Sequence, residues 1–212
     1  PPFAVPPPVG GATVDYDSWY DPWIPKTDLV AHYGGGANTA GEFSGVFAEG
    51  AGNPPPRPSW YEHPWKFISW RKSKEFLDQI AKEKAVIRGW ERYHRNKGWR
   101  GLAYNWPIGQ SGTVYRSRGW NYNGGHYTSD DIDHDGISSN KESITCVFIL
   151  GEGQTPTEYA WKSFRKMRRY IHKQTGIWPT VYGHKEIAAS GGHSTKCPGS
   201  IIMKMIVDTW RS

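Results

Sequence analysis

The chain has 212 residues, of which 37% are hydrophobic, and it carries 26 Lys and Arg against 20 Asp and Glu. This length suits one domain that buries a core, and the apolar content is too high for a disordered chain. The longest apolar runs, 144–150 and 201–207, are too short to span a bilayer. We therefore expect one soluble globular domain with no membrane insertion.

The start of the sequence is rich in proline, glycine and aromatic residues and shows no periodicity. It has no basic segment followed by a continuous apolar stretch, which argues against a secretory signal. We predict that residues 1–27 are an arm or linker and that residues 28–212 form the domain. Residues 1–65 contain two basic and seven acidic side chains, so the positive charge lies in the remainder. Such a charge favours a polyanionic partner, either nucleic acid or a cell wall.

The predicted elements begin with a strand at 27–33 that ends at Gly34. Residues 37–65 look irregular, and a helix is predicted from near Ser69 to just before Gly98. Its apolar residues recur at helical spacing, namely Phe76, Ile80, Val86 or Ile87, and Trp90 or Tyr93.

The second half of the chain alternates between strand and helix patterns. They are a hairpin of 102–108 and 113–117 around the turn 109–112, a buried strand at 143–150, a helix from an N-cap at Thr155 or Thr157 to Gly176, a strand at 178–184 and a helix at 201–210. This alternation predicts an α/β fold with a mixed central β-sheet flanked by helices.

The two cysteines have different surroundings. Cys146 lies in an apolar strand and Cys197 in a polar, glycine-rich loop, so a disulfide is not expected. His32 and His184 each lie near the end of a predicted strand, with Cys197 just beyond. Strand ends at one edge of a sheet bring residues together that are distant in the sequence. Imidazole and thiolate are suitable zinc ligands, so these three residues could form a zinc site. The alternative is that these are ordinary solvated loop side chains.

Five short motifs follow one another in a fixed order: VAH at 30–32, GWRGLAY at 98–104, NKESIT at 140–145, GHKE at 183–186 and TKCPG at 195–199. In this order they resemble the zinc N-acetylmuramoyl-L-alanine amidases of the peptidoglycan-recognition and phage-lysozyme type, from about residue 27 to the end. The resemblance implies a single domain of that fold behind an extended, proline-rich arm.

The resemblance also implies the zinc ligands, which would be His32, His184 and Cys197. This chain departs from compact family members in having twelve residues between His184 and Cys197. The additional residues include His193, which is an alternative ligand in place of His184.

Further roles come from the same resemblance. Tyr104 matches the catalytic tyrosine, and Thr195 matches a position filled by Thr or Lys in active members. His126 looks like the histidine that lines the substrate groove. These residues would hydrolyse the amide between N-acetylmuramic acid and the L-alanine of the stem peptide, using a zinc-activated water.

The expected protein is therefore a zinc-dependent amidase, such as a phage endolysin or a bacterial autolysin. It would bind bacterial peptidoglycan as a monomer and act at the cell wall, either released from the host by a phage or secreted. One alternative is a recognition module that binds peptidoglycan without cutting it. Another is a nucleic-acid binder, which is suggested by charge alone and has no recognisable binding motif, so no nucleic acid is expected.

Residues 131–142 match the spacing of an EF-hand calcium loop. Its predicted ligands are Asp131, Asp133, Asp135, the Ile137 carbonyl and Glu142. The alternative is a solvated acidic loop, which is favoured by Ser138 at a usually hydrophobic position and by the absence of a predicted helix on either side. A bound calcium would have a structural role.

Overall fold

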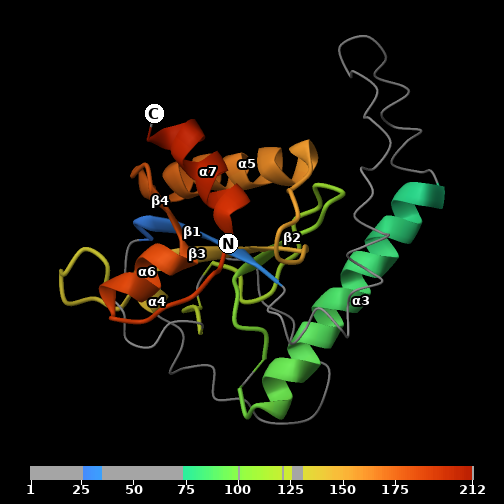
Figure 1. Cartoon of the computed structure of the whole chain (residues 1–212), viewed down its shortest axis with the longest axis horizontal. Coiled ribbons are helices and arrows are strands. Elements are labelled where there is room, and N and C mark those ends of the chain that lie inside the picture. The colour runs from blue at the N-terminus through green and yellow to red at the C-terminus, as the bar shows by residue number, and fades with distance from the viewer. Residues whose placement is uncertain (1–25, 35–73, 100, 121, 126–130, 212) are drawn as a thin grey trace.

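The computed structural model describes residues 26–34, 74–99, 101–120, 122–125 and 131–211 (Figure 1). Its elements are β1 (Asp28–Tyr33), α3 (Lys74–Asn96), β2 (Trp106–Ile108), α4 (Ser139–Glu142), β3 (Ser143–Phe148), α5 (Glu158–Thr175), β4 (Thr180–Gly183), α6 (His184–Ser190) and α7 (Ser200–Trp210). Most of the predicted arm, the irregular stretch at 37–65 and the expected helix start near Ser69 lie outside the described residues.

The four strands form one sheet in the order β2-β3-β1-β4, and every pairing between them is parallel. Successive parallel strands need crossover connections, and α5 lies in the one from β3 to β4, which flank β1 on its two sides. The predicted α/β fold with a central sheet flanked by helices is confirmed. The predicted hairpin around the turn 109–112 is present: Ile108 and Val114 form an antiparallel bridge, and three backbone hydrogen bonds in the same register join residues 105–109 to residues 113–117. Among the described residues, the mixed character of the sheet comes from this hairpin.

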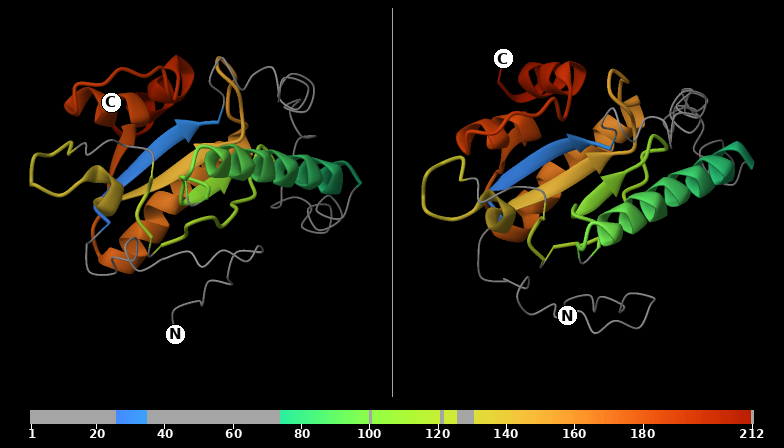
Figure 2. Two further views of the ribbon diagram at one scale, coloured as in Figure 1. Left: turned by 90° about the horizontal axis from the view of Figure 1, so that it is seen from below. Right: turned by 60° about the horizontal axis from the view of Figure 1, so that its bottom comes forward.

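Alternation along β1 divides the core into two faces. Leu29 and Ala31 belong to the main apolar cluster, which includes residues of α5 and α7. Val30 packs instead with Ile187 of α6. On the same side, Val86 and Trp90 of α3 pack with Val147 of β3, and Figure 2 shows α3 beside the β2 edge of the sheet. His32 shares the parity of Val30 and therefore points to the face that α3 and α6 cover.

Local signals explain where α5 begins and ends. The Thr157 side chain accepts a hydrogen bond from the Ala160 N–H, and Gly176 closes the helix with a positive φ of 74°. Thr157, and not Thr155, is therefore the N-cap. Among the described residues no helix is long and apolar enough to cross a membrane.

The last predicted strand ends earlier than expected. β4 stops at Gly183, and His184 is the first residue of α6, a helix that the pattern did not predict. The Glu186 carboxylate accepts a hydrogen bond from the Gly183 N–H at 2.8 Å, which caps the start of this helix. A second unpredicted helix, α4, occupies the four residues before β3 and is capped by Ser138.

Candidate metal centre

His32 is placed by the centre of the sheet. It lies near the carboxyl end of β1, pairs with Val147 in the β3 register and is 1% exposed. Because β1 is bordered by β3 and β4, the imidazole is held by a buried and well-connected strand. Its ring centroid lies 4.4 Å from that of His184.

His184 reaches the same place because β4 runs beside β1, with Gly183 opposite Ala31. The turn from β4 into α6 then presents the imidazole to His32. A Cβ atom at Gly183 would lie 2.1 Å from the Met203 sulfur and 2.8 Å from Pro198 Cδ. Glycine at this position therefore lets the loop before α7 approach the strand.

Cys197 completes the cluster from that loop. Its Sγ atom lies 3.5 Å from His32 Nδ1 and accepts a hydrogen bond from the Tyr33 N–H at 3.4 Å. The Lys185 N–H donates to the Cys197 carbonyl at 2.8 Å, which ties the loop to α6. One ligand atom from each of His32, His184 and Cys197 lies within 4.8 Å of the others.

Two of the three candidate ligands, His184 and Cys197, are uncharged near pH 7 in the metal-free protein. Burial lowers the pKa of His184 to about 4, so its imidazole is neutral near pH 7. Burial also raises the pKa of the Cys197 thiol to about 12, although the Tyr33 N–H opposes this shift. Two imidazoles and one thiol form the ligand set of a catalytic zinc with three protein ligands, and a bound cation would stabilise the thiolate. The residues present therefore fit zinc.

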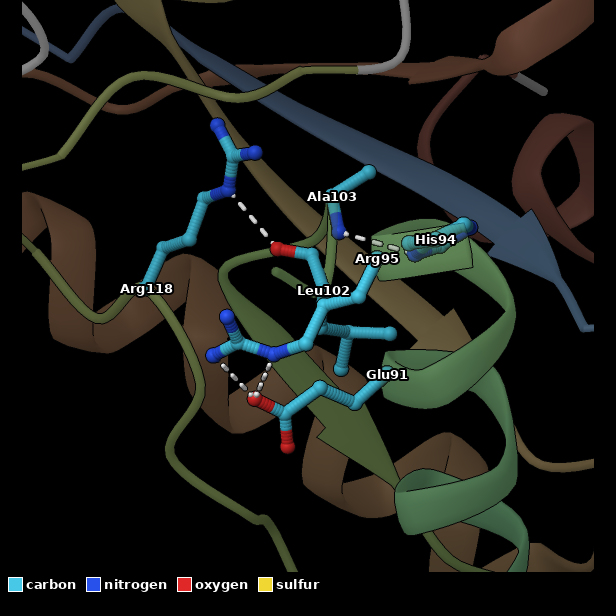
Figure 3. A network of polar contacts seen from close by, with 6 residues as sticks. All are labelled: Glu91, His94, Arg95, Leu102, Ala103 and Arg118. Atoms are coloured by element: carbon cyan, nitrogen blue, oxygen red, sulfur yellow. Dashed lines mark hydrogen bonds and ion pairs between the residues drawn. The ribbon is translucent and has the colours of Figure 1, made fainter. Parts of the chain in front are cut away.

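Tyr104 also lies beside His32, with ring centroids 5.1 Å apart. Burial raises the pKa of its hydroxyl, so it is a neutral donor across the physiological range. The preceding residues are tied to α3 and to a neighbouring loop (Figure 3). The Ala103 N–H donates to His94 Nδ1 at 3.2 Å, and Arg118 Nε donates to the Leu102 carbonyl at 2.8 Å.

Asn105 holds the segment from the other end. Its carboxamide nitrogen donates to the Gly119 and Tyr122 carbonyls at 2.9 and 2.8 Å, and its oxygen accepts from the Thr145 hydroxyl at 2.6 Å. The side chain is fully buried. Sequence reasoning did not find Asn105, His94 or Arg118, and the only signal for them is proximity to Tyr104 in the chain.

The remaining predicted residues differ in their placement. The Thr195 hydroxyl accepts a hydrogen bond from the Cys197 N–H at 3.2 Å, next to the cluster. His193 is exposed, and it is absent from the metal-ligand groups found among the described residues. The predicted substrate-lining residue, His126, lies outside the described residues.

The acidic loop forms a second cluster at the opposite ends of β1 and β3 (Figure 2). Four carboxylates contribute one oxygen each, and these oxygens all lie within 4.8 Å of one another. The carboxylates belong to Asp131, Asp133, Asp135 and Glu142. Gly136 has a positive φ of 88°, as the turn of a calcium loop requires. Burial, followed by the charge of Asp133, raises the pKa of Glu142 to about 8.

Together the fold and the cluster define a parallel α/β domain with a candidate histidine and cysteine metal site at the carboxyl edge of its sheet. The sequence profile of the N-acetylmuramoyl-L-alanine amidase family (Amidase_2) matches residues 68–200. The chain belongs to this family. The matched range includes His184 and Cys197, whereas His32 lies before it and is brought in by β1.

Relatives and solved structures agree with this assignment. Peptidoglycan-recognition protein SC2 of Drosophila melanogaster is 30% identical over 125 residues, which cover 57% of this chain and 59% of that protein. The chain therefore spans less than two thirds of the length of this curated relative. Two solved structures share the fold. The structure of bumblebee PGRP-SA aligns with a TM-score of 0.59 at 20% identity, and the alignment covers 94% of this chain and 90% of that chain. The N-acetylmuramoyl-L-alanine amidase LysC of Clostridium intestinale has a TM-score of 0.51 at 17% identity, covering 91% and 92%.

Proposed function

We propose that this protein is a zinc-dependent N-acetylmuramoyl-L-alanine amidase that cleaves the amide between N-acetylmuramic acid and the L-alanine of the stem peptide. The observation that carries the proposal is the convergence of ligand atoms from His32, His184 and Cys197 within 4.8 Å. Tyr104 lies beside this group and supplies the hydroxyl that a hydrolase requires in addition to a metal.

The roles of the residues follow from their chemistry. His32, His184 and Cys197 would hold zinc, which when bound lowers the pKa of a coordinated water and polarises a carbonyl. The Tyr104 hydroxyl donates a hydrogen bond to the oxygen on which negative charge develops during amide hydrolysis. The Thr195 oxygen accepts from the Cys197 N–H, so its own proton remains suited to a second such hydrogen bond.

The substrate and place of action are part of the proposal. Family membership and the peptidoglycan-recognition relatives support bacterial peptidoglycan as the partner. The basic charge beyond residue 65 supports attraction to an anionic envelope. A role as an endolysin or autolysin that acts at the wall as a monomer is consistent with this chemistry.

A second candidate is a recognition module that binds peptidoglycan without cutting it. The similarity to a Drosophila peptidoglycan-recognition protein favours it. The ligand cluster and Tyr104 favour the hydrolase, because binding alone requires neither a metal nor a buried hydroxyl beside it.

The test is a measurement of zinc content by mass spectrometry together with hydrolysis of a muramoyl peptide, followed as release of the free L-alanine amine. We expect one zinc per chain and hydrolysis that a chelator removes and zinc restores. Cys197→Ser should lose both zinc and activity. Cys146→Ala is the control, since Cys146 belongs to the apolar core and is not one of the grouped ligand residues. Peptide binding without hydrolysis by the zinc-loaded protein would establish the recognition module instead.

A further inference from the structure

The acidic loop at 131–142 gathers negative charge in one small volume, away from the histidine and cysteine cluster. Asp131, Asp133, Asp135 and Glu142 each direct a carboxylate oxygen into it. Four carboxylates at such distances repel one another strongly unless a cation lies among them.

An independent observation concerns buried oxygens that lack a partner. Glu142 is 2% exposed, and its Oε1 atom has no hydrogen-bond partner. Asp28, outside the loop, is 5% exposed, and its Oδ2 atom is likewise unpartnered. The charge of Asp28 is coupled to those of Asp133 and Asp135. Buried carboxylate oxygens are normally paired, so two of them beside an acidic cluster indicate a cation that satisfies both.

One nearby basic group does not account for this charge. Lys26 is buried too, and its ammonium donates a hydrogen bond to the carbonyl of Lys141. A single ammonium group cannot balance the charge of five carboxylates, and the Oδ2 atom of Asp28 and the Oε1 atom of Glu142 have no hydrogen-bond partner although Lys26 is present.

The ligand type selects the ion. All donors are oxygens, so a soft metal such as zinc is a poor fit. The carboxylates stand at positions 1, 3, 5 and 12 of the loop, and Ile137 at position 7 contributes a carbonyl in loops of this spacing. The helix α4 begins at position 9, where the exit helix of such a loop starts. Calcium takes six to eight oxygen ligands in flexible geometry, whereas magnesium keeps several waters.

We propose that residues 131–142 bind one calcium ion, that Asp28 adds a fifth carboxylate facing the ion, and that the ion fixes the loop to the amino ends of β1 and β3. Asp28 is the first residue of β1, and Glu142 immediately precedes β3. The ion therefore joins the loop to two central strands and stabilises the fold. This proposal does not depend on the amidase activity.

The first test is calcium binding to the full chain, with zinc present throughout and calcium removed by dialysis. Isothermal titration calorimetry should show one calcium per chain with a Kd between about 10⁻⁷ and 10⁻³ M. Saturating calcium should raise the Tm by several degrees, and the same concentration of magnesium should raise it less. A folded protein with no heat of binding and no Tm change in about 10 mM calcium would overturn the proposal.

Variants separate an ion site from a merely structural loop. Asp133→Asn with Asp135→Asn should abolish binding, lower the Tm relative to the wild type in calcium, and raise it in calcium-free buffer because repulsion is relieved. The matched control, Asp208→Asn, removes an exposed acid that pairs with Lys204 and should leave the calcium response unchanged. Wild-type binding by the double variant, or a Tm change of equal size and sign in both buffers, would contradict the proposal.

Discussion

The two ends of β1 carry opposite chemistry. At the carboxyl end, His32 lies in a cluster with the His184 imidazole and the Cys197 thiol, both of which are uncharged near pH 7 without a metal. At the amino end, Asp28 lies beside a loop of carboxylates that is strongly negative without a cation. One strand thus presents a soft-ligand centre suited to zinc and an all-oxygen centre suited to calcium, and ligand type alone distinguishes them.

The separation between these ends predicts independence. Asp28 and His32 are four residues apart in an extended strand, which corresponds to about 13 Å. Charge changes at one end should therefore have little effect on ligand geometry at the other. Substitutions at the carboxyl end of β1 should abolish hydrolysis, whereas substitutions at the amino end should change the stability of the fold.

The largest expected effect comes from removing a ligand at the carboxyl end. His32→Ala or Cys197→Ser should lower amide hydrolysis by about 10³-fold or more, because three protein ligands are needed to hold a catalytic zinc. Circular dichroism and the calcium-dependent Tm shift should stay near those of the wild type. Full hydrolysis by either variant would exclude the zinc mechanism.

Tyr104→Phe should have the next largest effect. Loss of one donor to a developing oxyanion typically lowers the rate by about 10² to 10³. The ring remains, so its packing beside His32 and the zinc content should be retained. Steady-state kinetics should show the loss in kcat with little change in KM. An unchanged kcat would reduce Tyr104 to a packing role.

A smaller effect is expected for acid stability near the carboxyl end. Burial, followed by the charges of Arg118 and Lys97, lowers the pKa of His94 to about 4 from a usual value of 6.5. The folded protein holds this imidazole neutral, so its contribution to stability is present above pH 6.5 and is lost as the pH falls toward 4. The loss should reach about 2 kcal/mol at pH 4.5.

His94→Asn tests this assignment, because the amide oxygen can replace Nδ1 as the acceptor for the Ala103 N–H without titrating. Urea unfolding of zinc-free wild type and variant at pH 7 and 4.5 should show a smaller acid-induced loss in the variant. His184 contributes equally to both proteins and cancels. Parallel losses would show that His94 does not control this pH dependence.

Much of the fold could be predicted because its signals are local. The buried strands β1 and β3 are short segments rich in apolar and β-branched residues, and α5 is delimited by Thr157 and Gly176. The short helices α4 and α6 were missed, since neither is long enough for an apolar period. The first strand of the predicted hairpin was too long, because β2 covers only Trp106–Ile108, whereas the segment 113–117 does pair with it through backbone hydrogen bonds.

Only part of the candidate site could be predicted from the sequence, for a different reason. His32, His184 and Cys197 stand in recognisable motifs, but their proximity depends on β4 lying beside β1, which is a tertiary fact. His94 and Arg118 support the segment before Tyr104 through backbone atoms of Ala103 and Leu102. Contacts to the backbone leave no pattern in side-chain types, so sequence reasoning could not find them.

The smallest predicted effect tests the amino end of β1. Asp28→Asn removes a buried charge that faces Asp133 and Asp135. At pH 8 it should raise the free energy of unfolding of the calcium-free protein, because burial and these neighbours raise the pKa of Asp28 to about 7 and the ionised carboxylate is then unfavourable. In saturating calcium the same change should be neutral or destabilising, because the ion then balances the carboxylate. Urea unfolding in both buffers measures the difference, and hydrolysis should stay unchanged if the two ends of the strand act independently.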